Sequence, residues 1–345
     1  KNIPDPKQLE IIPYTLLGRS TETRLDLGMD VRYGLTSNSI MKMTFNPDFG
    51  QVEADPSVLN LTAFETFYEE RRPFFSEGAE FFSQRLSLFH SRRIGRAPGY
   101  NLPEEGELKD APDYTTILGA TKVMGNTASG INYGLIGAIT AEESATLVID
   151  SADVQSVKDI VIEPRTNYTI GRFEVPMIND VSRVGLMVTD VSRKNNPGAT
   201  VAGMDWNLGF LDNRLFSNGQ IVRSDNNNIT GNAIRFNLGY MDPFWWSARF
   251  WYGHYDDEFN VNDLGYLRRN DTNWMGGRVE FRKQEPWGRF IYNDLELKYM
   301  QEWRGDGLVL ERELEIEQNN LFTNYWRAGF FSKVFLPAYN DEDIF

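Results

Sequence analysis

The sequence has no cysteine and only two histidines, His90 and His254, far apart in a chain of 345 residues. It therefore forms no disulfide or thiolate metal site, and two distant histidines exclude a multi-histidine metal centre. No apolar run approaches the roughly 18 to 20 residues that a membrane-spanning helix needs. The formal net charge of -14 argues against a nucleic-acid partner, because phosphate binding requires basic surface. We expect no nucleic acid, no metal and no cofactor.

What the chain has instead is long alternation of apolar and polar residues with a period of two. In 231–241 one parity is apolar, namely Ile234, Phe236, Leu238 and Tyr240, and the other is small or polar. Successive side chains of a strand point to opposite faces, so this pattern predicts a strand with one apolar and one polar face. Few segments are helical enough to cover the apolar faces, which favours lipid as their cover.

Strand candidates of this kind recur along the whole chain. They are 23–33, 40–45, 85–93, 115–123, 129–140, 166–175, 182–192, 203–211, 215–223, 231–241, 244–255, 273–281, 289–303, 308–316 and 325–336. Several match the roughly 9 to 11 residues that cross a bilayer at a tilt. We predict an all-β protein: a transmembrane antiparallel up-and-down β-barrel of about fourteen strands, by itself or as part of a larger barrel.

The chain is predicted to be a single barrel domain spanning 1–345, because all-β barrels of this length are commonly one unit. Three stretches lack sustained alternation. Residues 46–78 are expected to be irregular and to lie in or beside the lumen, and 96–113 and 256–272 are expected to be long loops.

Aromatic residues concentrate in 244–255, with seven of them in twelve positions. An interfacial girdle is the favoured interpretation, because amphipathic rings settle at headgroup depth. Its members would be Trp245, Trp246, Phe250, Trp251 and Tyr252. A soluble aromatic core is the first alternative and stacking against a glycan is the second.

Two charged segments are candidate sites. Residues 46–56 contain three carboxylates, Asp48, Glu53 and Asp55, but neither EF-hand spacing nor a nearby base supports calcium binding or acid–base catalysis. Glu70, Arg71, Arg72 and Glu77 are opposite charges beside the aromatic residues Phe74 and Phe75, and they suit an ion-pair network inside a lumen. We treat all seven as candidate ligand-binding or lumen residues.

A row of carboxylates follows later, where Glu311, Glu313 and Glu315 share one parity. A solvated face is the favoured interpretation, and a lumen wall with bases opposite is the alternative. No G-x-S-x-G elbow, phosphate-binding loop or catalytic triad is recognisable, so we name no catalytic residue and do not expect an enzyme.

The segments Asn46–Pro56, Asn60–Thr62 and Glu70–Gly78, followed by Ser91–Arg96 and Thr116–Lys122, closely resemble a family of uncharacterised bacterial outer-membrane-type β-barrels. That family is classed as a domain of unknown function, and its members commonly carry a β-sandwich similar to family-nine carbohydrate-binding modules ahead of the barrel. The resemblance implies location and architecture, and it assigns no functional residue. Glycan recognition does not transfer, since these residues contain no such module.

Together these features predict a protein of the Gram-negative outer membrane that passes, docks or presents a small or carbohydrate-like ligand. Its expected partners are outer-membrane lipid, such a ligand and, within a larger complex, other envelope proteins. The alternative is a soluble secreted or periplasmic all-β glycan-active hydrolase that uses Asp48, Glu53 and Asp55, since glycosidases need two carboxyl groups across a cleft.

Overall fold

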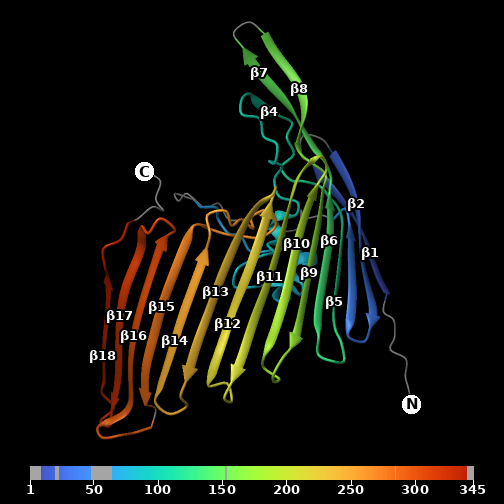
Figure 1. Cartoon of the computed structure of the whole chain (residues 1–345). Helices are drawn as coiled ribbons and strands as arrows, with labels where there is room; N and C mark the ends of the chain where they lie inside the picture. The colour runs from blue at the N-terminus through green and yellow to red at the C-terminus, as the bar shows by residue number, and fades with distance from the viewer. Residues whose placement is uncertain (1–8, 20–22, 48–63, 152–153, 284, 340–345) are drawn as a thin grey trace, which may run out of the picture.

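A computed structural model describes residues 9–19, 23–47, 64–151, 154–283 and 285–339. Its main feature is a fifteen-stranded antiparallel sheet, shown in Figure 1. The neighbours in this sheet follow the chain, except that β4, β7 and β8 leave it. The predicted all-β antiparallel class is therefore confirmed.

The strands of the main sheet are mostly long enough to cross a bilayer. They are β1 Leu9–Arg19, β2 Thr23–Thr36, β3 Ser39–Phe45, β5 Ile117–Asn126, β6 Asn132–Thr140, β9 Thr166–Pro176, β10 Arg183–Arg193, β11 Asn196–Phe210, β12 Leu215–Asn226, β13 Ile229–Met241, β14 Trp246–Tyr255, β15 Thr272–Lys283, β16 Phe290–Arg304, β17 Val309–Phe322 and β18 Arg327–Phe335. Tight turns join many of them. Between β12 and β13, Asn227 and Asn228 both have positive φ, which asparagine tolerates and a two-residue type I′ turn requires.

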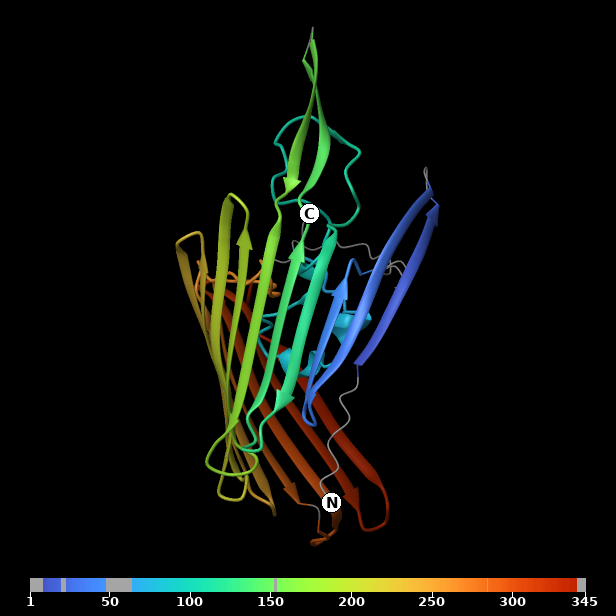
Figure 2. The ribbon, with the colours of Figure 1, turned by 90° about the vertical axis from the view of Figure 1, so that its right-hand side faces the viewer.

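A second, three-stranded sheet projects beyond one rim of the main sheet (Figures 1 and 2). It consists of β4 Glu107–Lys109, β7 Glu143–Ser151 and β8 Val154–Glu163, with β7 in the middle. The predicted loop at 96–113 thus contains a short strand. The hairpin of β7 and β8 has no counterpart among the strand candidates.

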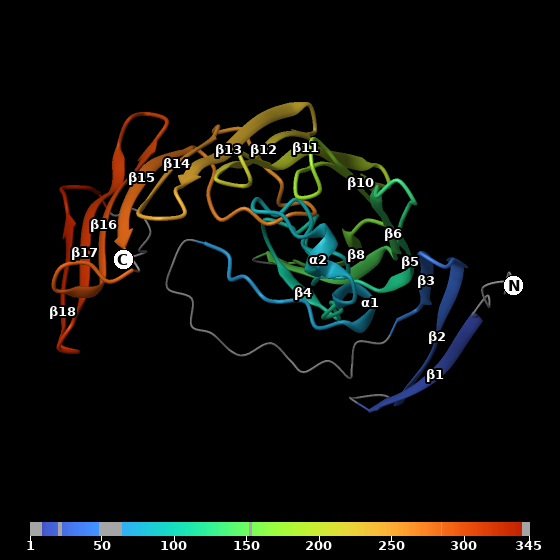
Figure 3. The same cartoon turned by 90° about the horizontal axis from the view of Figure 1, so that it is seen from below.

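The described helices are short: α1 Pro73–Ser76, α2 Ala79–Phe82 and the 3-10 helix η1 Ser91–Arg93. None of the described helices is long and apolar enough to cross a membrane. We call residues 64–95, which contain all three helices, the inner segment. Figure 3 shows α1 and α2 inside the curve of the main sheet. The strand expected over 85–93 is wrong, because only one isolated bridge, Ser87 to Tyr266, and η1 occur there.

The convex face of the main sheet is apolar. Large hydrophobic side chains that point outward are 37 to 50% exposed, and no other described element covers them. They are Leu135, Ile139, Phe173, Leu186, Val188, Met204, Ile221, Leu238, Phe250, Met275, Leu297 and Leu314. Alternation along each strand places their neighbours on the concave face, where polar residues such as Arg172 and Gln220 occur among apolar ones such as Ile136 and Met187.

The hydrophobic core lies between the concave face and the inner segment. Phe75, Phe82 and Leu88 of the inner segment pack in one buried cluster with strand residues such as Ile136 and Ile170. The connection from β14 to β15, residues 256–271, also folds inward, and its Phe259, Val261 and Leu264 join the same cluster. The core is therefore built from connections packed on one half of the sheet.

No closed barrel is found among the described strands, because β1 and β18 each have a neighbour on one side only. All fourteen successive pairings in the order are antiparallel, so the two edge strands run in the same direction. Closure into a cylinder, and hence the transmembrane barrel, stays a prediction.

Candidate functional site

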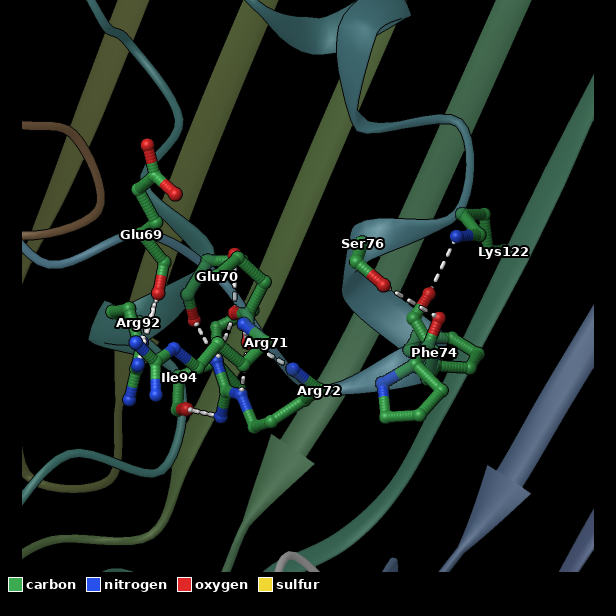
Figure 4. Close-up of polar contacts among 11 residues, drawn as sticks. Glu69, Glu70, Arg71, Arg72, Phe74, Ser76, Arg92, Ile94 and Lys122 are labelled. Carbon is green, nitrogen blue, oxygen red and sulfur yellow. Dashed lines mark hydrogen bonds and ion pairs between the residues drawn. The ribbon is translucent and has the colours of Figure 1, made fainter. Parts of the chain in front are cut away.

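The inner segment is organised around an ion pair between Glu70 and Arg72 (Figure 4). Arg72 Nε donates to Glu70 Oε1 at 2.9 Å, and its Nη2 donates to Oε2 at 2.7 Å, which gives a bidentate pair. The same carboxylate accepts from the backbone N–H groups of Arg71 and Arg72 and from Ser91 Oγ. Charge-assisted bidentate pairs are strong and directional, so this pair fixes the chain around it.

Arg72 also ties the start of α1 to η1. Its guanidinium donates to the carbonyl oxygens of Ile94 and Ser91, both at 2.6 Å, and lies 4.5 Å from the centre of the Phe75 ring. Because Arg72 is buried, these acceptors replace the water that a charge requires. The residues at the start of α1 and the 3-10 helix η1, about twenty residues further along, are thus joined through one guanidinium group.

A second cluster joins the inner segment to the 256–271 connection. Arg93 donates to both carboxylate oxygens of Glu65, at 2.8 and 2.6 Å, and to the carbonyl of Gly265 at 3.1 Å. Next to it, His90 lies against the rings of Phe67 and Tyr266, with centroids 4.8 and 5.8 Å away. The 256–271 connection therefore closes over the inner segment.

Glu70 and His90 of the inner segment have shifted pKa values. Burial alone would raise the pKa of Glu70, but the hydrogen bonds and positive charge of Arg72, with the hydroxyl of Ser91, outweigh it and lower that pKa. Burial, and secondarily the charge of Arg93, lowers the pKa of His90 to about 4. At neutral pH Glu70 is charged and His90 is neutral.

Polar side chains of the strands hold the inner segment against the sheet. Arg172 on β9 forms a bidentate pair with Asp205 on β11, at 2.8 and 3.1 Å, and Asp205 Oδ1 also accepts from Gln84 Nε2 at 2.6 Å. Arg235 on β13 donates to the carbonyl of Arg85 at 3.0 Å. These bonds explain why charged residues lie on the inward parity of the strands.

Lys122 of β5 anchors the turn between α1 and α2. Its ammonium donates to the carbonyl oxygens of Phe74 and Glu77, and Figure 4 shows it beside Phe74. Gly78 follows with φ 70°, and a Cβ there would meet the sulfur of Met124 at 2.7 Å. Glycine is therefore needed where the turn presses on β5.

A cavity of about 1400 Å³ lies between this turn and the strands β1, β2, β3, β5 and β6. Its wall carries Arg32, Lys42 and Lys122, together with Asn126, Asn132 and Tyr133. The inner segment contributes Glu77, Glu80 and Phe81. The cavity is large enough for a sugar-sized solute, since small-molecule pockets commonly measure about 300–1,000 Å³.

The structure describes four of the seven charged residues that the sequence singled out, and it brings three of them together. Glu70 and Arg72 are paired, the backbone of Arg71 binds Glu70, and Glu77 forms an ion pair with Lys42 at the cavity. Asp48, Glu53 and Asp55 lie outside the described residues. In the described part of the chain, no group of histidine, cysteine, aspartate and glutamate residues could hold a metal ion.

The five predicted girdle residues do not share one face. Phe250 and Tyr252 both pack against Phe236 on the convex side, with centroids 6.0 Å away. Trp251 faces the concave side, where its ring covers Gly276, so it does not belong with the outward residues.

Trp245 and Trp246 lie at the rim where β14 begins, beside Phe281 and Tyr240. The same rim carries Trp287, Phe290 and Phe322 at the turns of β15 to β18, with centroids 5.1 to 5.3 Å apart. Trp287 and Phe322 were missed in the sequence because they lie outside the expected strands, whereas Phe290 was missed although it begins the expected strand 289–303.

The carboxylate row on β17 faces the concave side, as in the less favoured of the two interpretations. Glu313 is only 2% exposed, and its oxygens accept from Lys298 at 2.8 Å and from Lys333 at 2.5 Å. The expected solvated face is therefore wrong for Glu313. Lys42, Lys122, Arg172 and Gln220 were also missed, and their only signal was a polar residue on the inward parity of a strand.

The chain belongs to a family described as a domain of unknown function (DUF5916), whose model matches residues 5–345. This confirms the resemblance to a family without an assigned function. No curated protein and no solved structure matches the chain.

Proposed function

We propose that this member of an uncharacterised family forms the wall of a bacterial outer-membrane β-barrel. In this proposal lipid covers the convex face, and the inner segment occupies the hydrated interior. The barrel docks or passes a small polar or carbohydrate-like ligand, and the sheet of β4, β7 and β8 contacts other envelope proteins beyond the rim. It is a binding and transport protein without a catalytic site.

The observation that carries the proposal is the opposite character of the two faces. Twelve large apolar side chains are exposed on the convex face, while the concave face holds Arg172, Lys122 and Gln220 against the inner segment. A soluble β-protein normally packs its apolar face against another layer and turns the polar face to water. The reverse arrangement suits a sheet that has hydrocarbon outside and water and protein inside.

The rim aromatics support the same orientation. Trp245, Trp246, Trp287 and Trp326 cluster where the strands β13 to β18 turn, and Trp245 and Trp326 are 54 and 74% exposed. Such rings suit the boundary between headgroups and hydrocarbon. The turns at the opposite rim are polar, as at 194–196 and 226–228. This rim carries the projecting three-stranded sheet (Figure 2).

The absence of cysteine makes a sharp test possible, because every introduced thiol is unique. Leu238 and Asn237 are neighbours on β13 that face opposite sides. A bimane label on Leu238→Cys, reconstituted in phosphatidylcholine vesicles, should be quenched when the acyl chains are brominated. The label on Asn237→Cys, which serves as the matched control, should be little quenched. Equal quenching at the two positions would contradict the proposal.

Location and transport need separate measurements. The native protein should fractionate with outer membranes and migrate differently on gels with and without boiling. Planar-bilayer conductance then distinguishes passage from docking: single-channel steps support passage, and a silent, inserted protein supports docking. Recovery of the protein only in the soluble periplasmic fraction would overturn the membrane proposal.

A further inference from the structure

Three cations lie side by side on the concave face of neighbouring strands. Arg32 on β2 faces Lys42 on β3, and Lys42 faces Lys122 on β5, in the register of the sheet. Like charges directly opposite in a sheet are destabilising. A row of three therefore needs anions or acceptors over it, and it is the kind of arrangement that a protein uses to hold an oxyanion.

Arg32 faces Glu10 across β1 and β2, whereas the acceptors of Lys42 and Lys122 come from one turn of the inner segment. Lys122 is 3% exposed and donates to the backbone carbonyls of Phe74 and Glu77. Lys42 instead pairs with the side-chain carboxylate of Glu77, which is 54% exposed. Lys122 is thus bonded to backbone carbonyls, whereas among the described residues the only carboxylate paired with Lys42 is one that solvent reaches.

The cavity in front of Lys42 also offers uncharged groups. Asn126 of β5 and Asn132 of β6 line it and share the concave parity of their strands, and Phe81 lines it from α2. Side-chain amides can bind the hydroxyl groups of a polar solute, and an aromatic ring can pack on its apolar face. A solute held here would have one anionic group on the lysine and polar groups toward the amides.

We propose that this cavity binds small solutes that carry a carboxylate or a phosphate, and that their oxyanion replaces the Glu77 carboxylate on Lys42. Release of Glu77 removes one side-chain bond between the inner segment and β3, while the bonds of Lys122 to the backbone remain. Solute binding thereby loosens the α1–α2 turn from the sheet without detaching it.

This inference extends the docking part of the proposed function, and it rests on that part alone. Binding can be measured on full-length protein purified in detergent, whether or not the protein conducts ions or fractionates with outer membranes. A failure of the membrane proposal and a failure of the anion site are therefore distinguishable.

The test is calorimetric titration with inorganic phosphate, glucuronate and, as a neutral control, glucose. Glu77→Gln removes the internal competitor and should tighten phosphate or glucuronate binding roughly two- to fivefold, the range expected for an exposed ion pair. Glu80→Gln makes the same charge change in the same cavity without freeing Lys42, and should change affinity less. Lys42→Gln should weaken binding roughly tenfold, and Lys42→Arg should restore most of it.

Comparing the affinities for phosphate and glucuronate distinguishes the two possible kinds of solute. Tighter phosphate binding indicates a phosphorylated solute, and tighter glucuronate binding indicates an acidic sugar. The proposal is overturned if Lys42→Gln binds both anions as the wild type does, if Glu77→Gln and Glu80→Gln behave alike, or if glucose binds as well as glucuronate.

Discussion

The side-chain amide of Gln220 on β12 forms two hydrogen bonds with the backbone of Leu86, in the place where the backbone of a neighbouring strand would form them. Leu86 N donates to Gln220 Oε1 at 3.0 Å, and Gln220 Nε2 donates to the carbonyl of Leu86 at 3.2 Å. The backbone N–H and carbonyl of Leu86 are thus both hydrogen-bonded, although the inner segment forms no strand there. Gln220 is only 1% exposed, so water does not compete for these bonds.

Gln220→Leu should therefore loosen the inner segment. It leaves a buried N–H and a buried carbonyl without a partner, which costs about 1–3 kcal/mol for each group that remains buried. Hydrogen exchange at Leu86 should accelerate by at least tenfold. Gln318→Leu, on β17 at the far end of the sheet, is the control and should leave exchange at Leu86 unchanged. Equal protection in both variants would show that the pairing does not hold the segment.

Arg72→Met should destabilise the protein by about 3–5 kcal/mol, because it leaves the carboxylate of Glu70 buried without its partner. Thermal unfolding in detergent measures the loss. The double variant Glu70→Gln with Arg72→Met should recover part of it, since no unpaired charge then remains. Arg71→Met is the matched control, because Arg71 is exposed, and it should cost less than about 1 kcal/mol. A loss as large in Arg71→Met would refute the role of the pair.

The inner segment should become less stable in acid. The pKa of Glu70 is lowered in the folded state, so its contribution is full above the unfolded value and disappears as the pH falls through the folded one. The pKa of His90 falls from 6.5 to about 4, so the unfolded state binds an extra proton between these values and stability decreases as the pH falls through this window. Both effects have the same sign.

His90→Gln isolates the second contribution. Since His90 keeps some contact with solvent, we expect it to account for about 1 kcal/mol of the loss between pH 6.5 and 4, less than the full shift would give. Resistance of the 64–95 region to protease, measured across this range, should depend less steeply on pH in the variant. An identical pH profile in wild type and variant would exclude His90 as a cause.

Charge on the convex face should prevent membrane assembly. Leu238→Arg places a guanidinium among outward apolar side chains between the tryptophan-rich rim and the bilayer midplane, where it is expected to cost about 1–3 kcal/mol. Asn237→Arg puts the same group on the concave face and should assemble far better. The heat-modifiable, membrane-inserted fraction of each variant measures the difference. Equal insertion would mean that hydrocarbon does not contact Leu238.

Much of the sheet could be predicted, because a strand with two different environments leaves a period-two pattern. The expected strands at 231–241 and 289–303 correspond to β13 Ile229–Met241 and β16 Phe290–Arg304. The strand count of about fourteen is close to the fifteen in the main sheet. The hairpin of β7 and β8 was missed because it stands outside the main sheet, where neither face is uniformly apolar.

The stretch 85–93 shows why alternation alone misleads. Its apolar residues Leu86 and Leu88 are two apart, as in a strand, but they are buried by the sheet while their backbone is bonded elsewhere. Leu86 bonds to a side chain of β12, and His90 N donates to the carbonyl of Leu264. Such partners come from distant parts of the chain, so local sequence does not reveal them.

Only those contacts of the candidate site that join residues close together in the sequence could be predicted. Glu70 and Arg72 are two residues apart, so their pairing could be expected from the sequence, whereas Lys42 reaches Glu77 from another part of the fold. An inward lysine in a strand shows that a charge needs a partner, but not which one. The three-dimensional register of β2, β3 and β5 was needed to assemble the basic row.

The common direction of β1 and β18 restricts how the sheet can be completed. A seam made directly between them would be the single parallel junction in an otherwise alternating ring. Two identical copies that insert with the same orientation would meet at parallel junctions as well. An all-antiparallel cylinder instead requires an odd number of intervening strands, and the first of them must run from the polar rim toward the tryptophan-rich rim.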